Sequence, residues 1–200
     1  RSYNKKVDIP QHALDDSVAY FFMTLRGHDV LPAVKTETPV SPGYAIENIL
    51  DRDTYYTKAV YLDTLRAIDM LRLVPEVNCS SIGIIGVGMG AAAGIFTAAY
   101  SDRVDALVMD APSFCYLSLS QNISTSDATA EINDFISTRK SRKKEIKRNL
   151  SYFDAMNFSD KIECPVMVVT GFKDTISPPE CVFALFNHLL TEKKRSEEHS

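Results

Sequence analysis

The sequence predicts an α/β fold with a mostly parallel β-sheet and helices on both faces of that sheet. Several short segments are apolar at every position, which is typical of strands buried on both faces of a parallel sheet. Segments with apolar residues at helical spacing separate them. A glycine turn, Gly86–Gly90, also joins one strand directly to a helix of small residues. In such sheets, ligands bind beyond the carboxyl ends of the strands.

The first half of the chain supplies the strand and helix on either side of that turn. An aromatic-rich apolar run at 17–25 indicates a buried strand, closed by Arg26-Gly27. Regularly spaced apolar residues then indicate a helix. The elements predicted here are strand 17–25, a loop over 29–45, a helix from a cap at Asp53 or Thr54 to Pro75, strand 81–85 and helix 91–100.

The second half contains two more buried strands, 104–109 and 165–170, around a segment of different character. Residues 113–150 begin Ser/Thr-rich and continue as one basic helix over 131–149, so we expect a lid-like helical insertion. Pro178 and Pro179 favour the start of a helix, since proline suits the first turn.

The ends of the chain define the expected domain organisation. Residues 191–200 are nearly all charged or polar and are expected to form a frayed tail. Residues 1–190 are expected to form a single, partial domain that includes the helical insertion.

Composition and charge exclude several classes of function. The 200 residues carry 22 Lys and Arg against 26 Asp and Glu, a formal net charge of −4, which argues against a nucleic-acid-binding protein. No apolar run approaches the roughly 20 residues that span a bilayer, so no membrane association is expected. The four cysteines have neither C-x-x-C nor zinc-ligand spacing, which favours reduced thiols in a cytoplasmic protein without a metal or other cofactor.

The glycine turn has two interpretations that the local pattern leaves open. In the first it is a dinucleotide fingerprint formed by Gly86, Gly88 and Ala91, with Asp110 as the ribose-binding acid at the end of the next strand. In the second it is a nucleophile elbow, G-x-S-x-G, in which the reactive serine would stand at the middle position. That position is Gly88, so the elbow would lack its nucleophile.

Motifs on both sides of the turn occur in the order found in one family of enzymes. Those before it are Arg26-Gly27, Tyr55-Tyr56, Val60-Tyr-Leu-Asp63, Arg66-Ala-Ile-Asp69 and Pro75-Glu-Val77. Those after it are Tyr152-Phe-Asp-Ala155, Asn157-Phe158, Ile162-x-Cys-Pro-Val166, Gly171-Phe-Lys-Asp174, Pro178-Pro179, Val182-Phe183 and Asn187-His188. Together they resemble the acetyl xylan esterase / cephalosporin C deacetylase family, from about residue 17 to about residue 190. The resemblance implies an α/β-hydrolase fold and favours the elbow interpretation.

The resemblance also assigns roles to individual residues. In this family a Ser–His–Asp triad removes acetyl groups from sugars and small esters, and its aspartate lies in G-x-x-D-x-x-x-P-P, which places it at Asp174. A turn-bonding or helix-capping role is the alternative for Asp174. The serine falls on Gly88, and the glutamine that usually follows it falls on Met89, whose backbone N–H would be an oxyanion donor. His199 is the candidate base by order, but it lacks the family's G-H-E turn.

These departures lead to an expectation of a partial and degenerate family member. Its N-terminal strands and its last strand are expected to be missing. The predicted function is binding of an acetylated sugar or small ester without hydrolysis. The resemblance also implies a homo-oligomer. One alternative is an active ester hydrolase completed by missing segments. The other is a dinucleotide-binding domain that uses Gly86, Gly88, Ala91 and Asp110.

Overall fold

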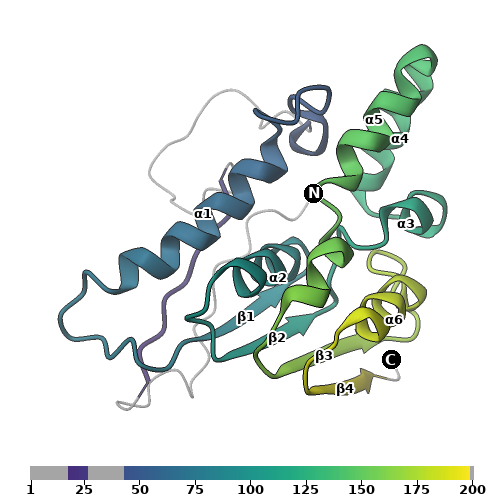
Figure 1. Cartoon of the computed structure of the whole chain (residues 1–200). Helices are drawn as coiled ribbons and strands as arrows, with labels where there is room; N and C mark the ends of the chain where they lie inside the picture. Colours follow the sequence, from purple (N-terminus) through teal and green to yellow (C-terminus); the bar gives the residue numbers. More distant parts are fainter. Residues whose placement is uncertain (1–17, 27–42, 199–200) are drawn as a thin grey trace, which may run out of the picture.

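A four-stranded parallel sheet forms the centre of the computed structural model, which describes residues 18–26 and 43–198 (Figure 1). The strands lie in the order β1-β2-β3-β4, and each pairs in parallel with its neighbour. Their bounds are β1 Gly83–Val87, β2 Ala106–Asp110, β3 Val166–Gly171 and β4 Lys193–Glu198. The prediction of a parallel sheet is therefore confirmed.

The helices follow the predicted order with two differences in detail. Their bounds are η2 Tyr44–Ile46, α1 Tyr56–Leu71, α2 Met89–Tyr100, α3 Leu117–Ile123, α4 Asp127–Thr138, η3 Lys140–Arg142, α5 Lys143–Ser151, η4 Ala155–Lys161 and α6 Pro179–His188. The single helix predicted over 131–149 is wrong, because the backbone of Arg139 leaves helical geometry (φ −127°, ψ 50°) and separates α4 from α5.

The start of α1 also differs from the prediction. The N-cap is Tyr55, which provides no side-chain cap, so the predicted cap at Asp53 or Thr54 is wrong. Instead, the carboxylate of Asp51 accepts hydrogen bonds from the backbone N–H of Asp53 (2.9 Å) and from Thr54 Oγ1 (2.9 Å). These two bonds fix the turn that leads into α1.

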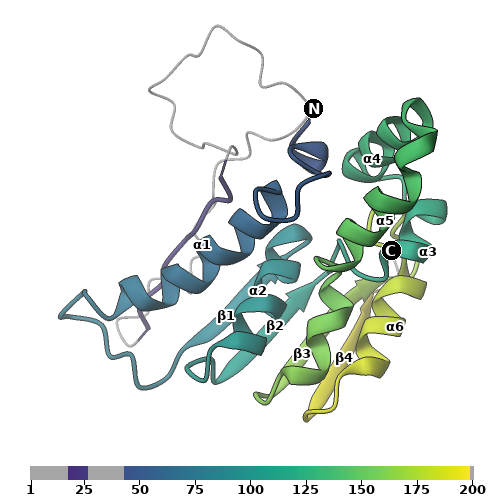
Figure 2. The same ribbon diagram turned by 45° about the horizontal axis from the view of Figure 1, so that its top comes forward.

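The core lies between the sheet and α2, which packs closely on β1 and β2 (Figure 2). Ala91, Ala92 and Ala93 are fully buried. A Cβ atom at Gly94 would lie 3.1 Å from the side chains of both Ile84 and Leu107. Small residues in α2 are therefore required by the short distance between helix and sheet.

An aromatic cluster joins α1, α2 and η4 beside this contact. Phe96 of α2 stacks on Tyr61 of α1 with ring centroids 5.0 Å apart and meets Phe158 of η4 edge-on at 5.3 Å. The hydroxyl of Tyr61 donates to the backbone oxygen of Phe153 at 2.8 Å. The motifs around Val60 and Tyr152 thus meet in one buried cluster.

Helices cover one face of the sheet in the described part of the chain. Leu107 and Met109 of β2 point to that face and are buried. On β1, Ile84 faces α2, whereas Ile85 and Val87 point the other way and are 73% and 63% exposed. Helices were expected on both faces of the sheet. Within residues 18–26 and 43–198 they cover only the face that packs on α2.

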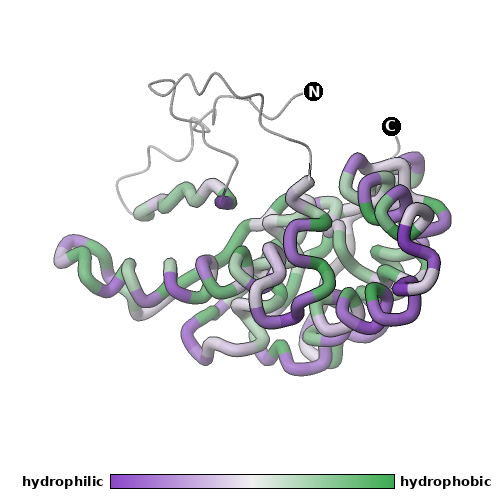
Figure 3. Tube along the Cα trace, turned by 90° about the horizontal axis from the view of Figure 1, so that it is seen from above, coloured by the Kyte–Doolittle hydropathy of each residue, from purple (hydrophilic) through white to green (hydrophobic). Residues whose placement is uncertain are grey.

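Two strand predictions need correction. The strand predicted at 17–25 is, over residues 18–26, an extended segment with no ladder to any described strand. Tyr20, Phe21 and Phe22 are exposed along it, and Figure 3 shows the segment as mostly hydrophobic. Arg26 fastens it to α1, because its guanidinium donates to both carboxylate oxygens of Asp63 (2.7 and 2.6 Å). Extended apolar sequence forms a strand only where a neighbouring strand accepts its backbone hydrogen bonds.

The expectations of a frayed tail and a missing last strand are wrong for residues 193–198. These residues form β4, which pairs with β3 from Val166↔Lys193 to Gly171↔Glu198. Backbone hydrogen bonds of the ladder hold this strand, and charged residues are common in strands at the edge of a sheet. The charged and polar composition of residues 193–198 therefore led to the wrong prediction of a frayed tail.

Replacing Gly86 with alanine should test the close contact between β1 and α2. A Cβ atom at residue 86 would lie 2.5 Å from the backbone oxygen of Gly90 and 2.6 Å from Ala91 Cα, so the free energy of unfolding should fall by about 3 kcal/mol or more. At Gly90 a Cβ atom would meet nothing within 4 Å, so Gly90→Ala is a matched control expected to change stability by less than about 1 kcal/mol. Urea unfolding followed by circular dichroism measures both; equal stability of the two variants would contradict the packing described.

Candidate functional site

Residue 88 occupies a sharp turn between β1 and α2. Gly88 has φ 55° and ψ −117°, a backbone conformation that favours glycine. Its N–H donates to the backbone oxygen of Asp110 (2.9 Å), and its own oxygen accepts from the N–H of Ser113 (3.1 Å). Main-chain bonds from the loop after β2 therefore fix this turn.

The space beside Gly88 is open to a side chain. A Cβ atom built there would lie 3.8 Å from Ser113 Oγ and would meet no other neighbour closer. Met89, the first residue of α2, is half-buried. Its N–H lies in the first helical turn, where backbone N–H groups have no acceptor within the helix. The turn thus has the sharp strand–turn–helix geometry expected of an elbow, and residue 88 carries no side chain.

Asp174 lies in the loop after β3 and is half-buried. Its Oδ1 accepts hydrogen bonds from the backbone N–H groups of Ile176 (2.8 Å) and Ser177 (2.9 Å). The Ser177 hydroxyl then donates to the oxygen of Ala111 at 2.8 Å, which ties this loop to the loop after β2. The turn-bonding role considered for Asp174 is present, and within residues 18–26 and 43–198 no group donates to its Oδ2.

The sheet brings these positions to one edge. Val87 pairs with Asp110 across β1 and β2, and Asp110 pairs with Val169 across β2 and β3, so the three strands end close to one another. Gly88 and Asp174 follow directly beyond those ends. Asp110 contributes its backbone oxygen to the turn, whereas Gly86 and Ala91 are buried beneath it.

The predicted base stays untested, because His199 lies outside the described residues. His188 is the histidine that the described part contains, and its Nδ1 lies 3.0 Å from the backbone oxygen of Ala184 in α6. It is the last residue of α6 and bonds within that helix. No described group of His, Cys, Asp or Glu side chains could hold a metal ion.

Two residues that sequence reasoning missed support the turn. Ser113 stands beside residue 88, as described above, in a loop where Ala111 and Phe114 both have positive φ. Asp154 is buried and accepts backbone hydrogen bonds from Tyr116 (2.8 Å), Leu117 (2.7 Å) and Met156 (3.1 Å). The Tyr152-Phe-Asp-Ala155 motif contains Asp154 and could have singled it out, although its three backbone partners could not be read from the sequence.

A parallel sheet with a sharp strand–turn–helix at residue 88 and a carboxylate after β3 defines the α/β-hydrolase class. Within that class, the chain belongs to the acetyl xylan esterase family, whose model matches residues 7–197. The fold and family predicted from the sequence are therefore confirmed. No helix in the described residues is both long and apolar enough to cross a membrane.

Individual proteins show the same similarity over part of their length. Acetyl esterase Axe7A of Xylanibacter ruminicola is 32% identical over 155 residues, covering 77% of this chain and 34% of that protein. The acetyl xylan esterase of a Paenibacillus species has a TM-score of 0.76 at 30% identity, covering 80% of this chain and 52% of that one. Acetyl xylan esterase 1 of a Thermoanaerobacterium species has a TM-score of 0.72 at 25% identity, covering 79% and 51%.

The chain thus spans about a third of the curated relative and about half of the two solved esterases. More distant structures, such as the acylaminoacyl peptidase of Pyrococcus horikoshii at 15% identity and a TM-score of 0.56, share the fold alone.

Substitutions of Asp174 should separate its turn-bonding role from its charge. Asp174→Ala removes the acceptor for two backbone N–H groups and is expected to lower the free energy of unfolding by about 1–2 kcal/mol. Asp174→Asn keeps one carbonyl oxygen for those donors and should lose less than half as much. Urea unfolding of both variants gives the comparison; an asparagine variant as unstable as the alanine variant would show that the charge itself holds the loop.

Asp154 should make stability depend on pH. Burial raises its pKa above the ordinary 3.8, although the backbone N–H groups of Leu117, Met156 and Tyr116 oppose that rise. A raised pKa stabilises the folded state below the unfolded value and loses that contribution as pH rises through the folded pKa. The stability of the wild-type chain relative to Asp154→Asn should therefore increase as pH falls from 7 to 4, measured by urea unfolding. A relative stability that instead rises toward pH 7 would mean that the three N–H donors outweigh burial.

Proposed function

We propose that this chain is a non-hydrolytic acetyl xylan esterase-type domain that binds an acetylated sugar or small ester at the carboxyl ends of its strands. The observation that carries this proposal is Gly88, which stands where an elbow would present the nucleophile. Its φ of 55° and its bonds to Asp110 and Ser113 support the elbow interpretation. The scaffold of the site is thus present without the atom that would attack a carbonyl.

The chemistry of the remaining groups is consistent with binding. The first-turn N–H of Met89 can donate to a carbonyl oxygen, and the Ser113 hydroxyl can donate or accept beside it. Neither replaces a hydroxyl at residue 88 that a histidine activates. Loss of nucleophile and base removes several orders of magnitude of rate in hydrolases of this kind.

Family membership also supports the elbow over the dinucleotide interpretation of Gly86, Gly88, Ala91 and Asp110. The alternative of an ester hydrolase completed by segments outside this chain is tested by the same assays as the proposal.

Two further parts of the proposal concern the location of the protein and its self-association. The cysteines at 79, 115, 164 and 181 are free thiols, which supports a reducing, cytoplasmic location. The exposed apolar side chains of Ile85 and Val87 on β1 support self-association, in line with the homo-oligomer expected from the family resemblance.

The purified chain should show no enzymatic turnover of p-nitrophenyl acetate and no stoichiometric labelling by a serine-directed fluorophosphonate. The physical reason is the absence of an activated hydroxyl at residue 88. Saturable turnover that Asp174→Asn abolishes would overturn the proposal. Labelling located at Ser113 would also overturn it, because Ser113 would then be the nucleophile in place of residue 88.

Restoring the nucleophile should test whether the rest of the site is intact. Gly88→Ser, alone and with Met89→Gln, should fold with a loss of about 1–3 kcal/mol, because the space is open and the cost is the positive φ. We expect the restored hydroxyl to remain unlabelled by fluorophosphonate at neutral pH, since no base faces residue 88 in the described part of the chain. Rapid labelling and ester turnover on reversion would show that a base is present and would contradict the predicted loss of the histidine.

A further inference from the structure

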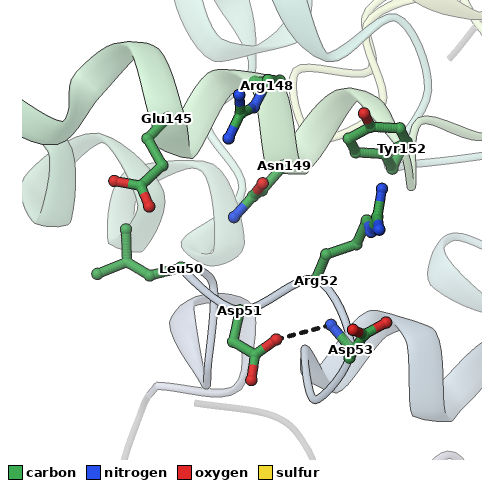
Figure 4. Close-up of a pocket in the computed structure, with 8 residues that line it drawn as sticks. All are labelled: Leu50, Asp51, Arg52, Asp53, Glu145, Arg148, Asn149 and Tyr152. Atoms are coloured by element: carbon green, nitrogen blue, oxygen red, sulfur yellow. Dashed lines mark hydrogen bonds between the residues drawn. The ribbon is translucent and has the colours of Figure 1, made fainter.

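A polar cleft of about 430 Å³ separates the turn before α1 from α5 (Figure 4). Its volume is in the range of small-molecule sites. Glu145 and Asn149 of α5 and Tyr152, the C-cap of that helix, follow one another at helical spacing and form one wall. None of the residues that line the cleft belongs to the candidate site at Gly88 and Asp174.

The carboxylates of the cleft are already engaged by neighbouring groups. Asp51 holds its own turn through Asp53 N and Thr54 Oγ1, which lowers its pKa. Asp53 pairs with Lys58 at 3.1 Å. Glu145 accepts both guanidinium bonds of Arg142, at 2.8 and 3.0 Å, which lowers its pKa as well. The lowered pKa values keep Asp51 and Glu145 ionised at neutral pH. The carboxylate oxygens of the cleft keep lone pairs for further donors.

The two arginines of the cleft have unused donors. The guanidinium of Arg52 lies 4.8 Å from the centre of the Tyr152 ring and donates no hydrogen bond to a described residue. Arg148 likewise has neither a side-chain hydrogen bond nor an ion pair within the described ranges. Figure 4 shows Arg52 reaching from the turn toward Tyr152, on the side of the cleft opposite α5. Both arginines line the cleft, and each has guanidinium N–H groups that bond to no described residue.

Carboxylate is the group that these cations match best. A guanidinium donates two parallel hydrogen bonds to a planar carboxylate. The remaining wall carries three carboxylates that can accept from hydroxyl groups. A compact anion such as phosphate places its charge close to all three carboxylates. A ligand with a carboxylate at one end and hydroxyls along the rest keeps its charge at the arginines and donates to the carboxylates through neutral groups.

A second, apolar pocket of about 220 Å³ continues from the first and shares Arg52, Asp53 and Tyr152 with it. Half-buried Leu62 and Phe96 supply apolar surface to it, whereas Tyr61 and Phe158, which also border it, are buried in the aromatic cluster described above. The C–H face of a pyranose ring is apolar and packs on aromatic side chains, while its hydroxyls point outward. The two adjoining pockets thus offer one polar and one aromatic lining to a single ring.

We propose that this pair of pockets is a binding site for a sugar acid, a hexuronate whose carboxylate pairs with Arg148 and Arg52. The site lies outside the candidate active site, and its existence does not depend on what binds beyond the strand ends. On the proposed esterase-type domain it would recognise an acidic sugar in addition to the acetylated sugar or ester.

Titration of the full chain with glucuronate, followed by calorimetry and by backbone amide NMR shifts, tests the proposal. We expect saturable binding, with shifts at Asn149 and Tyr152 and none at Gly88. Arg148→Gln and Arg52→Gln should each weaken binding about tenfold or more, since each removes a charge-assisted hydrogen-bond pair. Added salt should weaken binding as well.

Arg139→Gln is the matched control, because Arg139 is a cation on a neighbouring element whose guanidinium lies 4.0 Å from the Phe135 ring, outside the cleft. It should bind glucuronate as the wild type does. Glucose, acetate and phosphate should each bind at least about tenfold more weakly than glucuronate. The proposal is overturned by equal binding of acetate or phosphate, by unchanged affinity in Arg148→Gln, or by shifts confined to the strand ends.

Asp174→Asn keeps this result separate from the proposed function. It should leave glucuronate affinity unchanged, because Asp174 does not line the cleft. The two sites are separate, so an absence of glucuronate binding would contradict the sugar-acid site and would leave the proposed binding at the strand ends unaffected. Matching circular dichroism spectra and urea midpoints among the arginine variants show that a lost affinity is not lost folding.

Discussion

The short distance between β1 and α2 is the constraint on which the rest of the structure depends. Gly86 leaves no room for a Cβ atom against the backbone of Gly90 and Ala91, and a Cβ atom at Gly94 would lie only 3.1 Å from Ile84 and Leu107. Such proximity requires small residues on the helix and a sharp turn at its start. That turn sets the backbone of residue 88 and hence the position of the candidate site.

The loops after β2 and β3 extend this constraint across the edge of the sheet. Asp110 and Ser113 bond the main chain of Gly88 from one side, and Ser177 joins the Asp174 loop to Ala111 from the other. Asp154 in turn anchors the start of α3. These bonds run through the backbone or through buried polar groups, so the frame of the site does not require a reactive side chain. A glycine at the centre of an otherwise complete turn is therefore physically consistent.

The parts of the fold that could be predicted from sequence are those that local pattern determines. Apolar runs predicted β1, β2 and β3. The small residues after the glycine turn predicted α2, and the two prolines predicted the start of α6. Predictions failed where long-range pairing decides the outcome. The apolar segment at 18–26 has no described neighbour to pair with, whereas the charged segment at 193–198 pairs with β3. Gly88 and Asp174 could be placed by motif, but Ser113 and the partners of Asp154 depend on loop conformations with positive φ that the sequence pattern does not encode.

Within residues 18–26 and 43–198, no helix covers the face of the sheet that carries Ile85 and Val87, and this has a thermodynamic consequence. Ile85 and Val87 are largely exposed in the folded chain, so their transfer to water contributes little when the chain unfolds. The heat-capacity change of unfolding and the denaturant m-value both scale with newly exposed area. A sheet with helices on one described face should therefore have a flatter stability curve and a broader denaturant transition than a doubly covered sheet of equal length.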